Sequence, residues 1–166
     1  MIIFMARQHP GEVWSSYMML GIIKSLLKPS EESKYILKHF IIKIYPMVNI
    51  DGVVHGNFRC DITGVDLNRR WKDPSKIFHP QIYEIKKKIQ NYSKKYKVDI
   101  CFDLHGHSKN YNIFCYACKH NPYTCRILPY ILSRQNKRFY MPSCTFGLTK
   151  DKESTARATI SRIIKS

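Results

Sequence analysis

The sequence predicts an α/β fold in which a mostly parallel, mixed sheet is flanked by helices. Three short stretches have strand-like patterns, at residues 2–6, 40–49 and 97–105, and longer stretches with helical spacing lie between them. Strands that alternate with helices are typical of parallel sheets, because each parallel connection needs a crossover. A chain of 166 residues with 44% hydrophobic content can bury one core, so we expect a single domain over residues 1–166.

The first half of the chain supplies two of these strands and one helix. Residues 2–6, IIFMA, form a short apolar run, and residues 40–49 form a β-branched run of the kind buried in parallel sheets. Residues 14–28 predict an amphipathic helix that Pro29 ends. Its apolar residues recur at helical spacing: Trp14, Met18, Ile22 and Leu26. Residues 50–80 have no regular pattern, and long loops that carry apolar side chains are usually functional.

The second half predicts another helix and a strand that ends at a histidine. Residues 80–96 carry isoleucines at helical spacing between lysines, which indicates a surface helix. Alternation in residues 97–105 places Cys101, Asp103 and His105 on one face of a strand. Further along the chain we expect a strand at 112–117, a helix at 121–134, a loop at 141–154, and either a helix or a strand at 155–166.

Polar residues follow each of the three predicted strands. Glu12 follows the first strand, Asn68 and Arg69 follow the second, and His105 ends the third. Sites in parallel sheets gather at the carboxyl ends of the strands. We therefore expect these side chains to lie at one edge of the sheet.

The composition is strongly basic, with 28 Lys and Arg against 12 Asp and Glu and a formal charge of +16. Such a surface attracts polyanions, so nucleic acid, anionic membranes and acidic protein tails are all candidates from charge alone. The apolar runs are shorter than the roughly 20 residues of a membrane span, and MIIFMARQ is too short for a signal peptide. We therefore expect a soluble, intracellular, monomeric protein whose six cysteines are reduced thiols.

The stretch ARQHPGE places two metal-ligand side chains on a tight turn. Pro10 and Gly11 prevent a continuous helix, so His9 and Glu12 would converge across the turn. The pair alone is weak evidence, because a chain with seven histidines meets a His-x-x-Glu spacing by chance. A catalytic zinc needs three protein ligands and an open position, and His105 is the best third candidate because its strand end should face the same cleft.

Four motifs together resemble the zinc metallocarboxypeptidases, the M14 family. They are ARQHPGE, DGVVHGNFRC, GVDLNRRW and FDLHGHS, in this order along the chain. The chain is most similar to the cytosolic carboxypeptidases that trim glutamates from tubulin tails, and the resemblance extends from residue 2 to about residue 160. It implies a zinc carboxypeptidase-like α/β/α fold, here incomplete at both ends, and a partial catalytic domain over residues 1–166.

The resemblance also implies roles for single residues. His9, Glu12 and His105 match the ligands of one zinc ion per chain, and Asp66 matches the carboxylate behind them that orients a ligand histidine, here His9. Three arginines and one asparagine match residues that contact the substrate in this family. They are Asn68 and Arg69 for its terminal carboxylate, Arg59 for the oxyanion, and Arg157 near the pocket for its side chain.

Taken one at a time, these residues have ordinary explanations. His105 could bond to the backbone at a strand end, Asp66 could cap a turn, and Arg59 and Arg69 could be two more surface cations. These explanations do not account for four motifs in one order. The family's general base is a glutamate on a later strand, and Glu153 is a poor substitute because it lies in a lysine-rich loop. The resemblance therefore implies that this glutamate lies beyond residue 166, and we expect residues 1–166 alone to be catalytically incomplete.

The sequence thus predicts a zinc-dependent carboxypeptidase that removes C-terminal or side-chain-linked glutamates from protein tails such as that of tubulin. We expect acidic tails as partners, not nucleic acid or membranes, and a cytoplasmic location near microtubules or cilia. Two alternatives remain open: a related zinc deacylase of small amides, and a non-catalytic basic module that binds acidic tails.

Overall fold

The computed structural model describes residues 1–118 and 123–165. The chain divides into two compact units, one formed by Met1–Gly106 with Ser154–Ser166 and the other by His107–Glu153. No helix in the described part of the chain is both long and apolar enough to cross a membrane.

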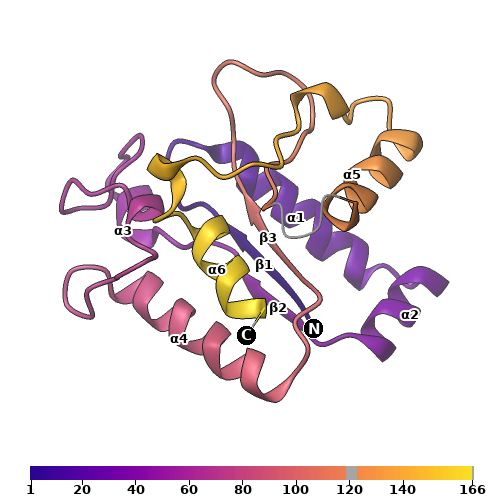
Figure 1. Ribbon diagram of the computed structural model, residues 1–166, viewed down its shortest axis with the longest axis horizontal. Coiled ribbons are helices and arrows are strands. Elements are labelled where there is room, and N and C mark those ends of the chain that lie inside the picture. Colours follow the sequence, from indigo (N-terminus) through magenta and orange to yellow (C-terminus); the bar gives the residue numbers. More distant parts are fainter. Residues whose placement is uncertain (119–122, 166) are drawn as a thin grey trace. The chain divides into compact units, whose positions relative to one another are not determined.

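A three-stranded parallel sheet forms the centre of the first unit (Figure 1). The strands are β1 (Ile2–Ala6), β2 (Ile42–Tyr45) and β3 (Ile100–Leu104), in the order β2-β1-β3. The register pairs Ala6 with Leu104, so the segments that follow β1 and β3 start from neighbouring points of the sheet. The carboxyl ends of these two strands carry the residues of the candidate site.

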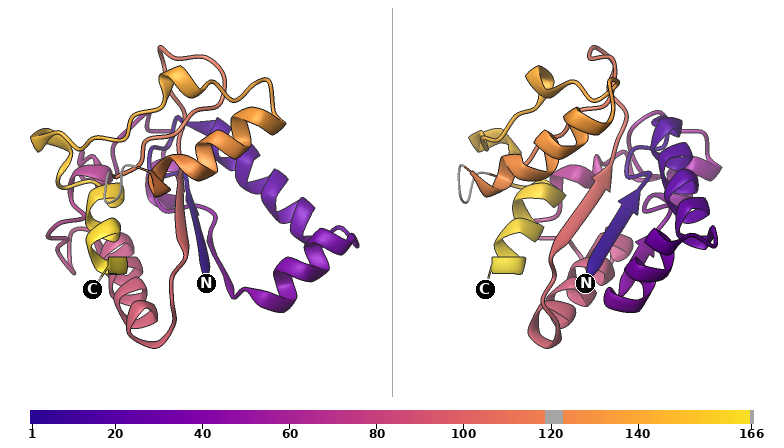
Figure 2. Two further views of the ribbon diagram at one scale, coloured as in Figure 1. Left: turned by 45° about the vertical axis from the view of Figure 1, so that its right-hand side comes forward. Right: turned by 90° about the vertical axis from the view of Figure 1, so that its right-hand side faces the viewer.

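Helices cover both faces of this sheet (Figure 2). On one face lie α1 (Val13–Leu27) and α2 (Glu31–His39), and on the other lie α4 (Pro80–Lys95) and α6 (Ala156–Lys165). Pro80 at the first position of α4 suits a helix start because proline lacks the N–H that would be unpaired there. Ser30 caps α2 by accepting from the backbone of Ser33, whose side chain accepts from Ser30 in return.

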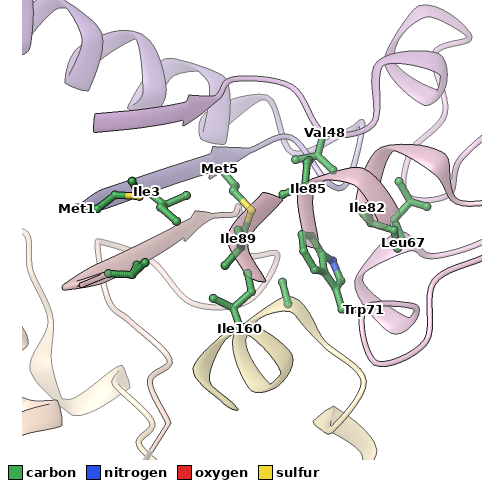
Figure 3. Close-up of a cluster of buried hydrophobic side chains, with 12 residues drawn as sticks. Met1, Ile3, Met5, Val48, Leu67, Trp71, Ile82, Ile85, Ile89 and Ile160 are labelled. Atoms are coloured by element: carbon green, nitrogen blue, oxygen red, sulfur yellow. The ribbon is translucent and has the colours of Figure 1, made fainter. Parts of the chain in front are cut away.

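The main core lies between the sheet and the helices α4 and α6 (Figure 3). Ile3 and Met5 of β1 are fully buried and belong to the same cluster as Ile82 and Ile89 of α4, which follow the predicted helical spacing. Trp71 reaches the same cluster from the loop between β2 and α4. This packing anchors that loop, which also carries α3 (Ile50–Val54) and the 3-10 turn η1 (Leu67–Arg69), against the sheet.

The second unit contains α5 (Thr124–Gln135) and two 3-10 turns, η2 (Met141–Ser143) and η3 (Lys150–Lys152). The prediction of a strand at 112–117 is wrong, because only two isolated bridges form there: Ile113 pairs with Phe139 and Tyr116 with Thr145. Single bridges between irregular segments do not build the continuous ladder of a strand. Residues 121 and 122 of the predicted helix 121–134 lie outside the described residues.

Three other sequence predictions need correction in detail. The strand predicted at 40–49 is limited to β2, and α2 and α3 were not predicted. The buried face of α1 centres on Ser15 and Met19, whereas Trp14 has 65% of its surface exposed. The hydrophobic spacing correctly predicted a helix. The buried residues of that helix, however, lie one position later in the sequence than the predicted stripe that starts at Trp14.

Candidate metal centre

The turn that follows β1 is held in an unusual backbone conformation by its own side chains. Arg7 has a φ of 60°, a value that non-glycine residues rarely adopt. Its Nε donates to the carbonyl of Pro10 at 2.7 Å, its Nη1 donates to Ser16 Oγ at 2.8 Å, and its backbone N–H donates to Ser15 Oγ at 3.2 Å. These bonds offset the cost of the left-handed conformation and fix the path of residues 8–12.

Two glycines let the turn pack closely against the loop that follows β2. A Cβ on Gly11 would lie 2.7 Å from the carbonyl oxygen of Phe58, and a Cβ on Gly52 would lie 2.6 Å from Cγ of Pro10. The N–H of Gly11 donates to that carbonyl of Phe58 at 2.7 Å. Glycine at these positions therefore allows the first and second predicted motifs to touch.

His9, Glu12 and His105 converge at the carboxyl ends of β1 and β3. Glu12 Oε1 lies 2.8 Å from Nδ1 of His9, and Glu12 Oε2 lies 2.9 Å from Nδ1 of His105. The N–H of Gly106 also donates to Oε2 of Glu12 at 2.8 Å. One potential ligand atom from each of the three residues lies within 4.8 Å of the other two.

A carboxylate lies behind each histidine. Nε2 of His9 is 3.0 Å from Oδ1 of Asp66, and Nε2 of His105 is 2.8 Å from Oδ2 of Asp103. A histidine whose Nε2–H donates to a carboxylate keeps Nδ1 on its other side as the nitrogen that can bind a metal. Both histidines thus direct the ligand-forming nitrogen toward Glu12.

The charges of this cluster shift the pKa values of its members. Burial alone would raise the pKa of Glu12, but its hydrogen bonds with His105 and His9 outweigh burial and hold it well below its usual range. Burial alone would lower the pKa of both histidines. For His9, contacts with Asp66 and Glu12 outweigh burial, and its pKa is raised. For His105, contacts with Asp103 and Glu12 do the same, and its pKa is also raised. The free site therefore tends to keep protons that a metal ion must displace.

The donor set fits a zinc ion. Two imidazole nitrogens and one carboxylate are the ligands that zinc uses in catalytic sites, where a fourth position stays open for water or substrate. The convergence of His9, Glu12 and His105 within 4.8 Å meets this requirement without a change of fold. Of the sequence-predicted site residues, these three and Asp66 are thus brought together.

The comparison with protein families agrees with this donor set. A family model described as zinc carboxypeptidase matches residues 1–139. The chain belongs to the zinc carboxypeptidase family. Among curated relatives, cytosolic carboxypeptidase 1 of Gallus gallus is 38% identical over 98% of the chain, and cytosolic carboxypeptidase 3 of Bos taurus is 38% identical over 96%. The resemblance drawn from the four motifs is thereby confirmed.

The chain spans only part of each relative: 15% of the length of the Gallus gallus protein and 17% of the Bos taurus protein.

Solved structures share the fold. A metallo-carboxypeptidase from Pseudomonas aeruginosa, solved with (2-guanidinoethylmercapto)succinic acid, is 26% identical with a TM-score of 0.79. The match covers 99% of this chain and 45% of the Pseudomonas aeruginosa chain. One from Burkholderia cenocepacia has a TM-score of 0.82 at 22% identity, with 99% and 45% coverage. The predicted fold class is confirmed.

In this member of the zinc carboxypeptidase family, Asp66 connects the candidate metal centre to two arginines. Its Oδ2 lies 2.8 Å from Nη2 of Arg59 and 3.8 Å from Nη1 of Arg69. Burial alone would raise the pKa of Asp66, but the contacts with His9 and Arg59 hold it well below its usual range. Asp66 is therefore ionised at neutral pH and can accept from the histidine and from the guanidinium at once.

Asn68 lies between the metal centre and helix α6. Its Oδ1 accepts from the backbone N–H of Ala156 at 2.9 Å, and its Nδ2 is 3.4 Å from Nε2 of His105. Arg157 follows Ala156 in the first turn of α6 and is half-buried. The structure thus brings Asn68 to the centre and places Arg157 next to the residue that Asn68 binds.

Sequence reasoning gave no role to three residues that support the centre: Asp103, Gln8 and Trp71. Asp103 precedes His105 by two positions, and strand alternation had already placed both side chains on one face. That alternation is the signal that could have identified Asp103. For Gln8 and Trp71 no local pattern exists, since their contacts join segments 63 positions apart.

Proposed function

We propose that this chain provides the metal and substrate-binding part of a zinc-dependent carboxypeptidase that removes glutamates from the acidic tails of proteins such as tubulin. The observation that supports the proposal most strongly is the convergence of His9, Glu12 and His105, with a carboxylate behind each histidine. Chance occurrence of a His-x-x-Glu pair would produce neither the third ligand nor these carboxylates.

The residues around the centre have complementary tasks. Zinc held by His9, Glu12 and His105 would polarise the scissile carbonyl and activate water. Arg59 uses Nε and Nη2 for Asp66, so Nη1 is the group that would donate to the oxyanion. We assign the general base to none of the described residues.

The substrate's terminal carboxylate would be held by Asn68 and Arg69. Oδ1 of Asn68 is engaged with Ala156, which leaves Nδ2 as its donor to substrate. Nη1 of Arg69 donates to the carbonyl of Asn68 at 3.0 Å, so Nε and Nη2 remain for a carboxylate. We place Arg157 at the pocket for the glutamate side chain.

The charge of the chain favours an acidic substrate. A formal charge of +16 would raise the rate of encounter with glutamate runs, and this supports the proposal of acidic tails as partners. We propose a cytoplasmic, monomeric enzyme that works on microtubule or ciliary tubulin tails.

Zinc binding by the chain tests the proposed metal centre. The wild-type chain should take up about one zinc ion per molecule, measured by isothermal titration calorimetry and elemental analysis. The Glu12→Ala variant should lose this binding. The Glu84→Ala variant removes an exposed glutamate on α4 and should retain it. A folded wild-type chain that takes up no zinc at saturating concentration would contradict the proposal.

Substrate comparison tests the rest. A protein that combines this chain with a general base should release glutamate from a glutamate-tailed peptide and leave an acylated amino acid intact. The reverse preference would favour a zinc deacylase. Binding of tubulin tails that is unchanged when zinc is removed and Arg69 is replaced would favour a non-catalytic basic module.

A further inference from the structure

We propose that Trp71, Gln8 and Asp103 form a buried positioning relay that fixes the orientation of His105 toward the metal. Trp71 Nε1 donates to Gln8 Oε1 at 2.7 Å, Gln8 Nε2 donates to Asp103 Oδ2 at 2.6 Å, and the same Oδ2 lies 2.8 Å from Nε2 of His105. The relay connects the hydrophobic core to the metal centre. It rests on the proposed function, because its effect is exerted on a zinc ligand.

The direction of every hydrogen bond in the relay follows from Trp71. An indole N–H can only donate, so the amide of Gln8 must turn its oxygen toward Trp71. The amide nitrogen of Gln8 then faces Asp103 and donates to it. Trp71 and Gln8 are both fully buried, so water does not compete for these bonds. The orientation of the Gln8 amide is therefore decided by the core.

Asp103 transmits this orientation to His105. A carboxylate oxygen can accept two hydrogen bonds, and Oδ2 of Asp103 receives one from Gln8. At 2.8 Å the other is donated by Nε2–H of His105. With Nε2 of His105 held by Asp103, Nδ1, which lies 2.9 Å from Oε2 of Glu12, is the nitrogen left to bind a metal. The relay thus fixes the orientation of the imidazole ring, with Nε2 toward Asp103 and Nδ1 toward the candidate metal position.

The neighbouring amide of Asn68 does not reverse this assignment. Its Nδ2 lies 3.4 Å from Nε2 of His105, whereas Asp103 lies at 2.8 Å and carries a negative charge. The shorter, charge-assisted bond determines where the proton resides. The longer approach of Asn68 is then a contact between two donors.

The second oxygen of Asp103 argues against a purely stabilising role for this carboxylate. Within the described part of the chain, no protein group donates to Oδ1 of Asp103, although it is buried. Burying an unpaired polar atom lowers stability. A carboxylate that is kept at such a position is better explained by what it does for His105 than by its contribution to folding.

A double-mutant cycle on zinc affinity tests the relay in the full chain. Gln8→Leu keeps the volume of the side chain but removes the donor to Asp103, and it should weaken zinc binding about 10- to 100-fold, as is typical for the partners of ligand histidines. Asp103→Ala should have an effect of similar size. If Gln8 acts through Asp103, the double variant should bind zinc no more than about twofold more weakly than Asp103→Ala alone.

Two further measurements separate positioning from general destabilisation. Cobalt bound in place of zinc should show a shifted visible absorption spectrum in Gln8→Leu, since the direction of a ligand has changed. The matched control is Asp61→Asn, which alters a carboxylate that is 3% exposed and accepts from Thr63 and Val65, outside the relay. This control should lower the melting temperature and leave zinc affinity and the cobalt spectrum unchanged.

Additive effects of Gln8→Leu and Asp103→Ala would overturn the relay, as would wild-type zinc affinity in a folded Gln8→Leu chain. If Gln8→Leu does not fold, Trp71→Phe replaces it in the same cycle, because it removes the N–H that orients Gln8. Since it also removes ring volume from the core, its melting temperature is compared with that of the Asp61→Asn control. A wild-type chain that binds no zinc would overturn the proposed function together with the relay. A wild-type chain that binds zinc normally while the cycle is additive would overturn the relay alone.

Discussion

Nε2 of His9 lies 3.0 Å from Oδ1 of Asp66, although the two residues are 57 positions apart in the sequence. The other oxygen of Asp66 lies 2.8 Å from Nη2 of Arg59. One carboxylate therefore orients a candidate zinc ligand and at the same time holds the guanidinium assigned to the oxyanion. A change at Asp66 should affect both the metal and the substrate side of the site.

The Asp66→Asn variant should bind zinc about 10- to 100-fold more weakly than the wild-type chain. The neutral amide is a weaker acceptor for Nε2–H of His9, and it no longer pairs with the charge of Arg59. Competition with a chromogenic chelator would measure the affinity. Asp73→Asn, an exposed carboxylate outside the site, serves as the control. Equal affinity in all three chains would contradict the assigned role of Asp66.

Zinc binding near pH 7 should release protons and should become tighter as the pH rises. The pKa values of His9 and His105 are both raised above 6.5 in the free site, so protons occupy nitrogens that the metal needs. Calorimetric titrations in buffers of different ionisation enthalpy would count the protons released. A binding enthalpy that does not depend on the buffer would refute this prediction.

The metal-free chain should be most stable between about pH 5 and pH 6.5. The raised pKa values of the histidines stabilise the folded state below the ordinary value of 6.5, and this contribution is lost as the pH rises through the folded values. The lowered pKa of Glu12 stabilises it above the ordinary value of 4.5, and this is lost as the pH falls. Urea denaturation across pH 3 to 9 would reveal the maximum, which should become shallower in Glu12→Gln because Asp66 and Asp103 still contact the histidines.

Gly52→Ala should lower the free energy of unfolding by about 1–3 kcal/mol, the usual cost of forcing extra volume into a packed region. A Cβ there would meet Cγ of Pro10 at 2.6 Å and the carbonyl of Cys60 at 2.8 Å. Gly21→Ala is the matched control, since nothing lies within 4 Å of its added Cβ on the exposed side of α1. That control should raise stability by about 0.5–1 kcal/mol. Thermal unfolding would compare the two variants.

Binding of a glutamate-tailed peptide should weaken steeply with salt, because the formal charge of +16 attracts it through screened, exposed charges. Fluorescence anisotropy between 20 and 300 mM NaCl would measure the effect, with a glutamine-tailed peptide of equal length as the control. The same salt dependence for both peptides would show that carboxylates are not what the chain recognises.

The parts of the fold that were predictable have strong local patterns. The three strands and helix α4 follow from apolar runs and isoleucine spacing, and the resemblance carried by four motifs in one order points to the candidate ligand set. Helix α2 was missed because EESKYILKH contains few apolar residues and depends on its cap at Ser30. Trp14 belongs to the apolar face predicted for α1, yet it is exposed. Hydrophobic spacing identifies a helix reliably, but it does not fix which of two adjacent positions packs on the sheet.

The supporting residues of the site were harder to predict for a physical reason. Alternation along β3 reveals that Asp103 and His105 share a face, yet it says nothing about which residue lies beside them. The register of β3 with β1 decides that neighbour. It pairs Met5 with Asp103, so that Gln8, in the turn after β1, can donate to the Asp103 carboxylate. Contacts of this kind depend on sheet register, which single-sequence patterns leave undetermined.

The pairing of Ala6 with Leu104 has a consequence for how this family can diverge. The turn with His9 and Glu12 and the residue His105 start from adjacent points of one backbone ladder, so their spacing depends little on the surface of the protein. Lineages that differ in helix surface and net charge should therefore keep the same spacing of these three side chains. A single-residue deletion at the end of β1 or β3 is the kind of mutation that such lineages should not tolerate.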